Sequence, residues 1–275
     1  MRLLYGDLGE QGCRDLKDFG DWVLVLGDGR LTATKKNGES EPTWVDIPDD
    51  LLIKTSGDKI KAIIDEVFPR FIDNYTNHCY LACRAIVCPN NSTDDQINDC
   101  IVDMIPSEPK EYLSCDTISK SSEYLPDFDI LYPPEFLNSI NVNNFPSHKL
   151  VLKKGVTIML LRNLNQSMGL CNGTRLLVTS LGHRLLECVI LTGSNIGETT
   201  FIPRIALTTT SPKWPFTLQR RQFPVRICYA MTNNKSQGQT LSRVGVYLKK
   251  NLFSCMANYM LLFLDQHQGK VLEYS

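Results

Sequence analysis

The 275-residue sequence lacks the long apolar run that a membrane protein needs. No stretch reaches the roughly 18 consecutive apolar residues of a spanning helix, and the first residues lack the basic-then-apolar order of a signal peptide. We therefore expect a chain that is neither embedded in a membrane nor secreted.

The cysteines lack the spacing of a disulfide framework or a zinc site, although there are ten of them. They are scattered and several lie in apolar stretches, which is typical of buried thiols in a reducing compartment. The group His78, Cys79, Cys83 and Cys88 has no pair of cysteines separated by two residues, so the sequence predicts no metal site.

An excess of charge of one sign is also lacking. The formal net charge of −1 excludes a strongly basic surface over the whole chain, but not DNA binding in a narrow groove, where local charge matters more. The hydrophobic content of 43% is enough for the core of one large domain or two modest ones.

The chain has no phosphate-binding loop of the form Gly-x-x-x-x-Gly-Lys-Ser/Thr, and no apolar strand ending in the acidic pair that holds magnesium. ATP hydrolysis needs the lysine of that loop and the metal to neutralise the developing charge. We therefore expect that this chain alone does not hydrolyse ATP, and we assign it no catalytic residue, no metal ligand and no cofactor of its own.

A polar segment at residues 229–241 is the most informative feature that is present. It follows an apolar run and combines Thr, Asn, Lys, Ser, Gln and Gly, a mixture that no hydrophobic core requires. Gly lets the backbone approach closely, while hydroxyl, amide and ammonium groups supply donors for phosphate. The plainer alternative is a polar turn between two buried strands.

Local patterns predict a parallel sheet. Residues 84–88 form an apolar strand that Pro89 ends, and residues 93–96 have the capping-box spacing of a helix start. A strand, a turn and a capped helix in this order are one unit of a parallel sheet. A second unit follows at a strand over 225–230, the polar segment, and a strand over 244–248. The helix that residues 93–96 open has an apolar stripe of Ile97, Ile101, Met104 and Ile105.

Short β segments and turns dominate residues 151–207. Strands are predicted at 156–161, 185–191 and 199–207, and the pair Asn172-Gly173 is a strong hairpin signal. This spacing predicts a small barrel of about five strands.

The lead-in to about residue 75 is expected to be irregular and partly helical. Within it, apolar residues at helical spacing predict a helix over 60–67, which Pro69 ends.

Cations alternate with aromatic residues between 213 and 223, as they do in proteins that bind single strands. Core aromatics with a solvated basic rim are the interpretation that we favour for this stretch.

The polar segment resembles the fifth helicase motif of superfamily-one DNA helicases, in the form found in the Pif (petite integration frequency) family and its Helitron transposon relatives. Residues 89–91 resemble the fourth motif of that family. Between them lie residues 132–138, 150–155, 158–163 and 171–175, which resemble the small inserted β domain of these helicases. The order of the three matches is the order found in the family.

The resemblance implies an α/β fold: an incomplete second RecA-like lobe of the P-loop NTPase type, with an inserted small β-barrel of the 2B type. The implied domains are a remnant of the first lobe and a linker at 1–76, the second lobe at 77–131 and 211–253, the inserted barrel at 132–210, and a tail at 254–275.

The resemblance also implies a set of site residues. DNA-facing residues would be Thr232, Asn234, Lys235 and Ser236. Residues of the nucleotide cleft would be Asn91, Gln237 and Gly238. Relatives usually carry an apolar residue at the position of Asn233, and this departure is expected to loosen the loop.

The tail departs from the family. The sixth motif has the form His-Gly-Gln-Leu-Tyr-Val-Ala-Leu-Ser-Arg, and residues 255–267 do not match it. Synonymous codons for these residues, read in a shifted frame, give that motif followed by Ser-Thr-Ser-Arg. We therefore expect a frameshift in the gene and an unrelated tail from about Ser254.

We expect a fragment of an ATP-dependent five-prime to three-prime DNA helicase, limited to binding single-stranded DNA. The family implies ATP and magnesium as cofactors of the intact enzyme, roles in DNA repair, recombination and telomere maintenance, and a location in the nucleus. A first RecA-like lobe would be needed for ATP hydrolysis. Two alternatives stay open: a non-catalytic β-barrel binding or scaffolding module, and a decayed transposon product without function.

Overall fold

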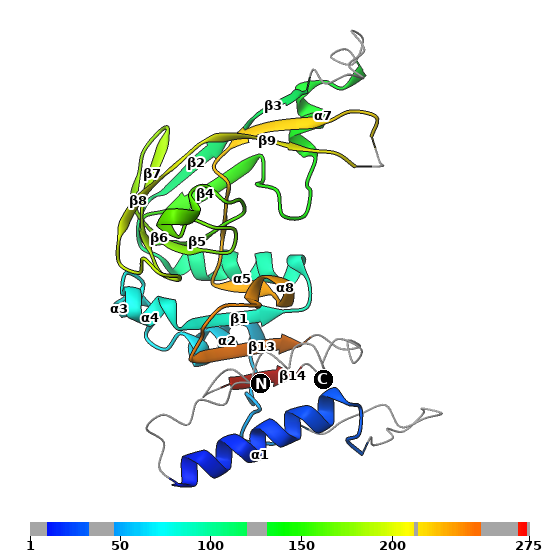
Figure 1. Cartoon of the computed structure of the whole chain (residues 1–275), viewed down its shortest axis with the longest axis vertical. Coiled ribbons are helices and arrows are strands. Elements are labelled where there is room, and N and C mark those ends of the chain that lie inside the picture. Colours follow the sequence, from blue (N-terminus) through cyan, green and yellow to red (C-terminus); the bar gives the residue numbers. More distant parts are fainter. Residues whose placement is uncertain (1–9, 33–46, 120–130, 212–213, 249–268, 274–275) are drawn as a thin grey trace. The chain divides into compact units, whose positions relative to one another are not determined.

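The computed structural model describes residues 10–32, 47–119, 131–211, 214–248 and 269–273 (Figure 1). The chain forms two compact units. The first unit comprises residues 1–74, 79–101 and 229–275, and the second comprises residues 75–78 and 102–228. The structural division thus falls at 101/102 and 228/229, while the domain boundaries implied at 132 and 210 stay a prediction.

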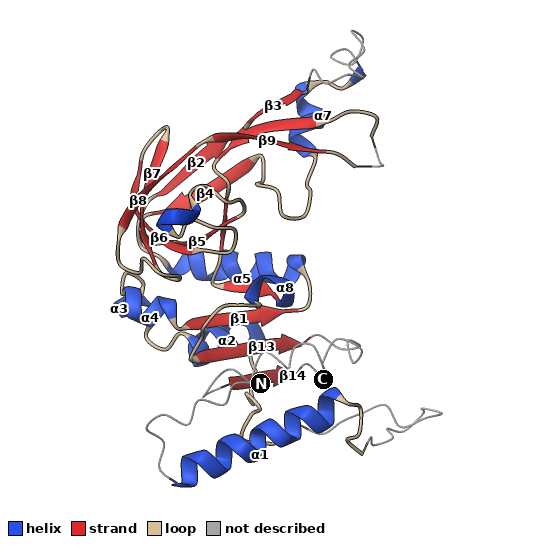
Figure 2. Cartoon of the chain, viewed as in Figure 1, coloured by secondary structure: helices blue, strands red, loops and turns tan. Residues whose placement is uncertain are grey.

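The first unit contains a four-stranded parallel sheet in the order β12-β1-β13-β14 (Figure 2). The predicted parallel sheet is therefore confirmed. The strand β1 has the bounds that the sequence predicted, and its last four residues are all buried, as expected for a strand covered on both faces. The strands are β1 (Arg84–Cys88), β12 (Ala230–Thr232), β13 (Arg243–Leu248) and β14 (Gly269–Glu273).

Helix α2 (Lys59–Val67) packs on this sheet with the apolar face that the sequence predicted. Its start is capped by Asp58, whose carboxylate accepts from the backbone of the first turn. Gly245 of β13 makes the close packing possible, because a Cβ there would lie 2.5 Å from Cγ2 of Val67 and 2.9 Å from Cγ1 of Ile63. The other helices of this unit are α1 (Glu10–Gly27), α3 (Phe71–Asn74), α4 (His78–Ala82), which starts at the unit boundary, and α8 (Asn233–Ser236).

Helix α5 (Asn91–Met104) follows β1, as predicted, but its cap is not Thr93. The side chain of Asn90 caps the helix instead, because its Oδ1 accepts from the backbone N–H of Thr93 at 2.9 Å. Asn is among the most favourable N-cap residues, and here it comes three residues before the capping box. Thr93 is consequently buried in the first turn.

The second unit contains a five-stranded antiparallel sheet in the order β11-β5-β6-β7-β8. Five strands were predicted, but in the described residues no pairing between β11 and β8 closes the sheet into a barrel. Asn172-Gly173 does form a turn, in which the N–H of Thr174 donates to the carbonyl of Cys171 at 3.0 Å. The predicted tight hairpin is not formed, because residues 161–174, which include η1, connect β5 to β6. The strands are β5 (Thr157–Leu160), β6 (Arg175–Leu181), β7 (Leu185–Ile190), β8 (Thr199–Pro203) and β11 (Val225–Ile227).

Two predicted strands are each divided between different sheets. The strand predicted over 199–207 breaks at Arg204 into β8 and β9 (Ile205–Thr209), and β9 belongs to a three-stranded sheet, β3-β10-β9. The strand predicted over 225–230 breaks at Cys228 into β11 of the second unit and β12 of the first. The remaining strands are β2 (Pro109–Leu113), β3 (Cys115–Ile118), β4 (Lys149–Lys153) and β10 (Leu218–Gln222), with β2 and β4 paired as a two-stranded sheet.

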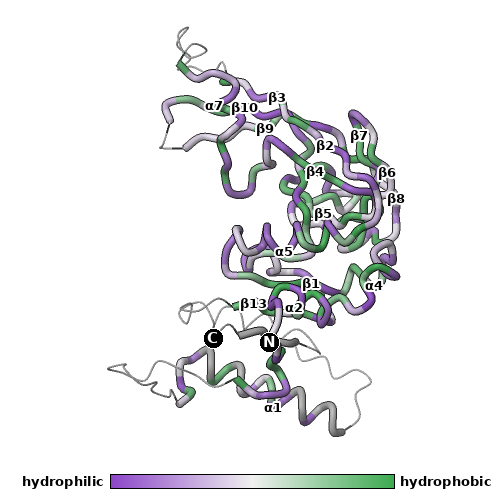
Figure 3. The backbone as a smooth tube through the Cα atoms, turned by 180° about the vertical axis from the view of Figure 1, so that it is seen from behind, coloured by the Kyte–Doolittle hydropathy of each residue, from purple (hydrophilic) through white to green (hydrophobic). Residues whose placement is uncertain are grey.

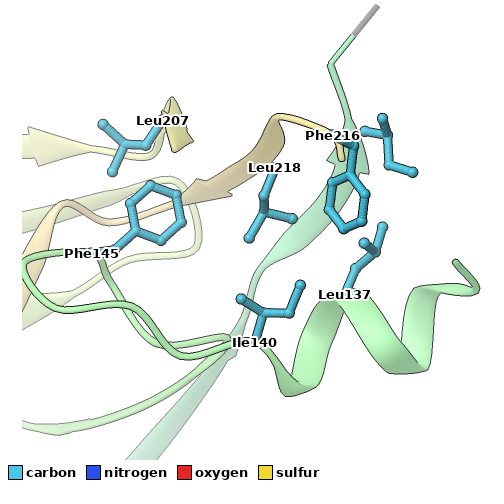
Figure 4. Packing of buried hydrophobic residues seen from close by; sticks show 7 residues of the cluster. Leu137, Ile140, Phe145, Leu207, Phe216 and Leu218 are labelled. Carbon is cyan, nitrogen blue, oxygen red and sulfur yellow. The ribbon is translucent and has the colours of Figure 1, made fainter. Parts of the chain in front are cut away.

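A hydrophobic cluster joins helix α7 (Pro134–Ser139) to the three-stranded sheet (Figure 4). Leu137 and Ile140 point from the helix side toward Leu218 and Phe216. The favoured interpretation of residues 213–223 is thus confirmed for the aromatics, since Phe216 and Phe223 are buried. It is wrong for the basic rim at Arg220, which is itself fully buried.

Figure 3 shows that hydrophobic residues predominate along β1 of the first unit and β5 of the second. A short 3₁₀ helix, η1 (Gln166–Met168), completes the second unit. Among the helices within the described ranges, none has both the length and the apolar character to cross a membrane.

Candidate nucleic-acid interface

The two helicase-like segments lie at the same edge of the parallel sheet. Cys88, the last residue of β1, pairs in register with Thr232, the last residue of β12. Residues 89–91 and 233–240 therefore leave adjacent parallel strands at their carboxyl ends. Open α/β sheets bind ligands at this edge, so the fold brings together the two segments that the sequence singled out.

Three of the predicted site residues are exposed at this edge. Asn234, Gln237 and Gly238 are exposed, whereas Thr232 and Asn91 are half-buried. Gly238 has a φ of +81°, a conformation that favours glycine, and a Cβ there would meet no atom within 4 Å. The segment therefore presents two amide side chains and an open backbone to solvent.

The two other predicted DNA contacts turn inward. Ser236 is buried, and its hydroxyl donates to the backbone carbonyl of Asn233 at 2.7 Å. The side chain of Lys235 is only 14% exposed, and its Nζ lies 4.0 Å from Oδ2 of Asp94 on α5. These two side chains cannot reach a strand in solvent without a local rearrangement.

Sequence reasoning missed Asn98, whose side chain connects α5 to the backbone at the start of the polar segment. Its Nδ2 donates to Oδ1 of Asp94 at 2.6 Å and to the carbonyl of Ala230 at 3.0 Å. Its Oδ1 accepts from the backbone N–H groups of Tyr229 and Ala230, both at 2.9 Å. Both donors and both acceptor positions of the amide are thus used.

A signal for this contact exists in the sequence. Asp94 and Asn98 are four residues apart on one face of α5, beside the apolar residues Ile97 and Ile101. A polar pair inside an apolar stripe indicates a buried hydrogen-bonded contact, because burial of unsatisfied polar groups is costly.

The charge of Asp94 affects the pKa of the Cys88 thiol at the end of β1. Burial is the main cause that raises the pKa of the Cys88 thiol, and the Asp94 carboxylate raises it further. The Asp94 carboxylate thus acts on the last residue of β1, the strand from which residues 89–91 leave.

No metal site accompanies this interface within the described parts of the chain, where no three His, Cys, Asp or Glu side chains are grouped to hold an ion. Cys79 is exposed and Cys83 is half-buried, whereas Cys88 is buried. The cysteines near His78 therefore do not form a common site.

Residues 135–181 match the family model of the 2B domain of the DNA helicase Pif1. The matched residues lie in the second unit and include α7, β4, β5, η1 and β6. The ATP-dependent DNA helicase PIF1 of Homo sapiens is 32% identical over 145 residues, which are 51% of this chain and 22% of that protein. The ATP-dependent DNA helicase PIF6 of Trypanosoma brucei brucei is 29% identical over 119 residues, 41% of this chain and 15% of that protein.

One solved structure agrees with these sequence matches in fold. The crystal structure of Pif1 helicase from Candida albicans has a TM-score of 0.50 and 20% identity, and covers 79% of this chain and 53% of that one. Bacteroides Pif1 bound to ssDNA has a TM-score of 0.47 and 18% identity, and covers 69% of this chain and 40% of that one.

Part of this chain is therefore similar to Pif-family DNA helicases, as the sequence predicted, and its mixed α/β fold resembles Pif1 helicase domains. The matched part spans about a fifth of the human relative.

Proposed function

We propose that this chain is part of a Pif-type ATP-dependent DNA helicase, and that its own capacity is to bind single-stranded DNA without hydrolysing ATP. The observation that carries the proposal is the register of Cys88 with Thr232, which brings residues 89–91 and 233–240 to one edge of a parallel sheet. The match to the Pif1 2B domain supports the assignment to this kind of helicase.

In this proposal the parallel sheet of the first unit belongs to the second RecA-like lobe, and the five-stranded sheet belongs to the inserted 2B-type domain. Asn234 and Thr232 contact the sugar-phosphate backbone first, and Lys235 and Ser236 join after a rearrangement of the segment. Asn91, Gln237 and Gly238 face the nucleotide cleft once a first lobe completes it.

ATP and magnesium belong to the completed enzyme in this proposal, because the phosphate-binding loop is absent from the sequence. Five-prime to three-prime unwinding, a nuclear location, a Helitron origin and roles in repair, recombination and telomere maintenance are proposed for the intact protein only.

The test is fluorescence anisotropy of a labelled oligothymidine at several salt concentrations. We expect binding that weakens as salt rises, because phosphate contacts release counterions. The double substitution Thr232→Ala, Asn234→Ala is expected to weaken binding several-fold. Lys61→Gln is the control, since it removes an exposed charge from α2, outside the two helicase-like segments.

Two results contradict the DNA-binding part of the proposal. One is the absence of salt-dependent oligonucleotide binding by the folded protein, which favours a non-catalytic binding module instead. The other is unchanged affinity in the double variant. Release of labelled phosphate from ATP by the purified chain would show that the catalytic part of the proposal is wrong.

A further inference from the structure

We propose that Asp94 is an internal competitor for the DNA phosphate, which holds Lys235 inside the first unit until a strand binds. The inference rests on the proposed function, because it names a residue that regulates the same segment. Asp94 lies outside the helicase-like motifs that the sequence pointed to.

The burial of the pair is the first observation. The side chain of Asp94 is 1% exposed and that of Lys235 is 14% exposed. The two atoms that face each other, Oδ2 of Asp94 and Nζ of Lys235, are themselves shielded from solvent. A buried ammonium group needs a counter-charge, and the carboxylate supplies it here.

The distance between the charges is the second observation. Nζ and Oδ2 are 4.0 Å apart, whereas a hydrogen-bonded ammonium–carboxylate pair is about 2.8 Å apart. The electrostatic attraction between Asp94 and Lys235 is therefore weaker than that of a hydrogen-bonded pair. A phosphate oxygen at hydrogen-bond distance can replace Asp94 as the counter-charge of the lysine. The exchange leaves the buried carboxylate without its cation, so Asp94 opposes it.

The anchoring of the two partners is the third observation. Asp94 is fixed, because Asn98 binds its other carboxylate oxygen and the backbone of Tyr229 and Ala230. Lys235 lies between the exposed Asn234 and the exposed Gln237, and its side chain is long and flexible. On strand binding the lysine moves and the carboxylate stays.

The first test needs no DNA. The rate of Lys235 acetylation is followed by mass spectrometry in the wild-type chain and in Asp94→Asn, which keeps an oxygen for Asn98. We expect slow labelling of Lys235 compared with the exposed Lys54 and Lys149, and labelling at least several-fold faster in Asp94→Asn. Asp95→Asn is the matched control, because it removes the same charge from an exposed position on the same helix.

The second test measures oligothymidine binding. Asp94→Asn is expected to tighten binding about three- to tenfold, within the range of coupling between contacting residues. Adding Lys235→Gln to this variant should remove the gain. Lys235→Gln alone should lower the slope of log affinity against log salt by about 0.7, the contribution of one phosphate contact on a single strand. This single variant keeps the test valid if Asp94→Asn does not fold.

The outcomes separate the two proposals. An unchanged rate of Lys235 acetylation in Asp94→Asn would contradict the proposal that Asp94 competes with DNA phosphate. A Lys235→Gln variant that binds DNA like the wild type would contradict it as well. If no variant binds DNA while Asp94→Asn still labels faster, the pair is established and the proposed function is the part that fails.

Discussion

Arg220 and Asp116 form an ion pair in which neither side chain is exposed to solvent. Nη2 of the guanidinium lies 2.6 Å from Oδ2 of the carboxylate, and Nε lies 2.9 Å from Oδ1. Arg220 also donates to the carbonyls of Pro146 and Leu137. The pair joins β10 to β3 and fixes the chain that surrounds the hydrophobic cluster of α7.

Asp116→Asn is predicted to destabilise the protein by about 3–5 kcal/mol, because it leaves a buried guanidinium without its counter-charge. Urea unfolding measures this loss. The control is Glu111→Gln in the pair that Glu111 forms with Lys149, whose side chains are 46% and 60% exposed. An exposed pair contributes about 1 kcal/mol or less. Equal losses in the two variants would contradict the prediction.

Asn98→Leu is predicted to destabilise the backbone at the start of the polar segment. The backbone N–H groups of Tyr229 and Ala230 and the carbonyl of Ala230 lose their side-chain partner, and each such loss costs about 1–3 kcal/mol. Hydrogen exchange at these two amides should accelerate and urea unfolding should shift to lower concentrations. Gln96→Leu, at an exposed position of the same helix, should change neither measurement appreciably.

The elements whose pattern is local were predictable from the sequence. The strand β1 has the predicted bounds because its apolar run ends at Pro89, which cannot continue a central strand. Helix α2 follows its apolar spacing and ends before Pro69. The parallel sheet was predicted as well, and its register is what brings residues 89–91 and 233–240 to one edge.

The features that were missed depend on partners distant in the sequence. The apolar run at 225–230 does not reveal that its two halves pair with different sheets. Lys235 was expected to face DNA, and only the fold shows that Asp94 lies within 4.0 Å of it. Arg220 was expected at a solvated rim, because its partner Asp116 is 104 residues away. The predicted DNA and nucleotide contacts themselves stay predictions.

Gly245→Ala is predicted to destabilise the first unit by about 1–3 kcal/mol, the usual cost of overpacking a core. The added methyl group would lie 2.5 Å from Cγ2 of Val67, so α2 or β13 must shift. Adding Val67→Ala should recover part of the loss, and the two substitutions should therefore be non-additive. In Gly57→Ala the methyl group would lie 3.8 Å from Oγ1 of Thr55, and little change in urea unfolding is expected.

The raised pKa of Tyr80 predicts that the protein loses stability at high pH. Burial raises the pKa of its hydroxyl from 10.0 to about 12, although Arg84 and Arg243 act in the opposite direction. Because the folded state holds the proton more tightly than the unfolded state, this contribution is complete below pH 10 and is lost as pH rises toward 12. The hydroxyl also donates to the carbonyl of Pro69 at 3.1 Å, a contact that the phenolate cannot make.

Tyr80→Phe isolates this effect from other groups that titrate in the same range, such as the buried Cys188, whose pKa burial raises to about 12. The difference in phenolate absorbance between the wild type and Tyr80→Phe gives the titration of Tyr80 directly. We expect its midpoint near pH 12. We also expect urea unfolding of Tyr80→Phe to depend less steeply on pH between 10 and 12, because only the wild type must release this proton on unfolding. A midpoint near the ordinary tyrosine value of about 10 would show that the hydroxyl is solvated, and the folded state would then gain no stability from holding the proton.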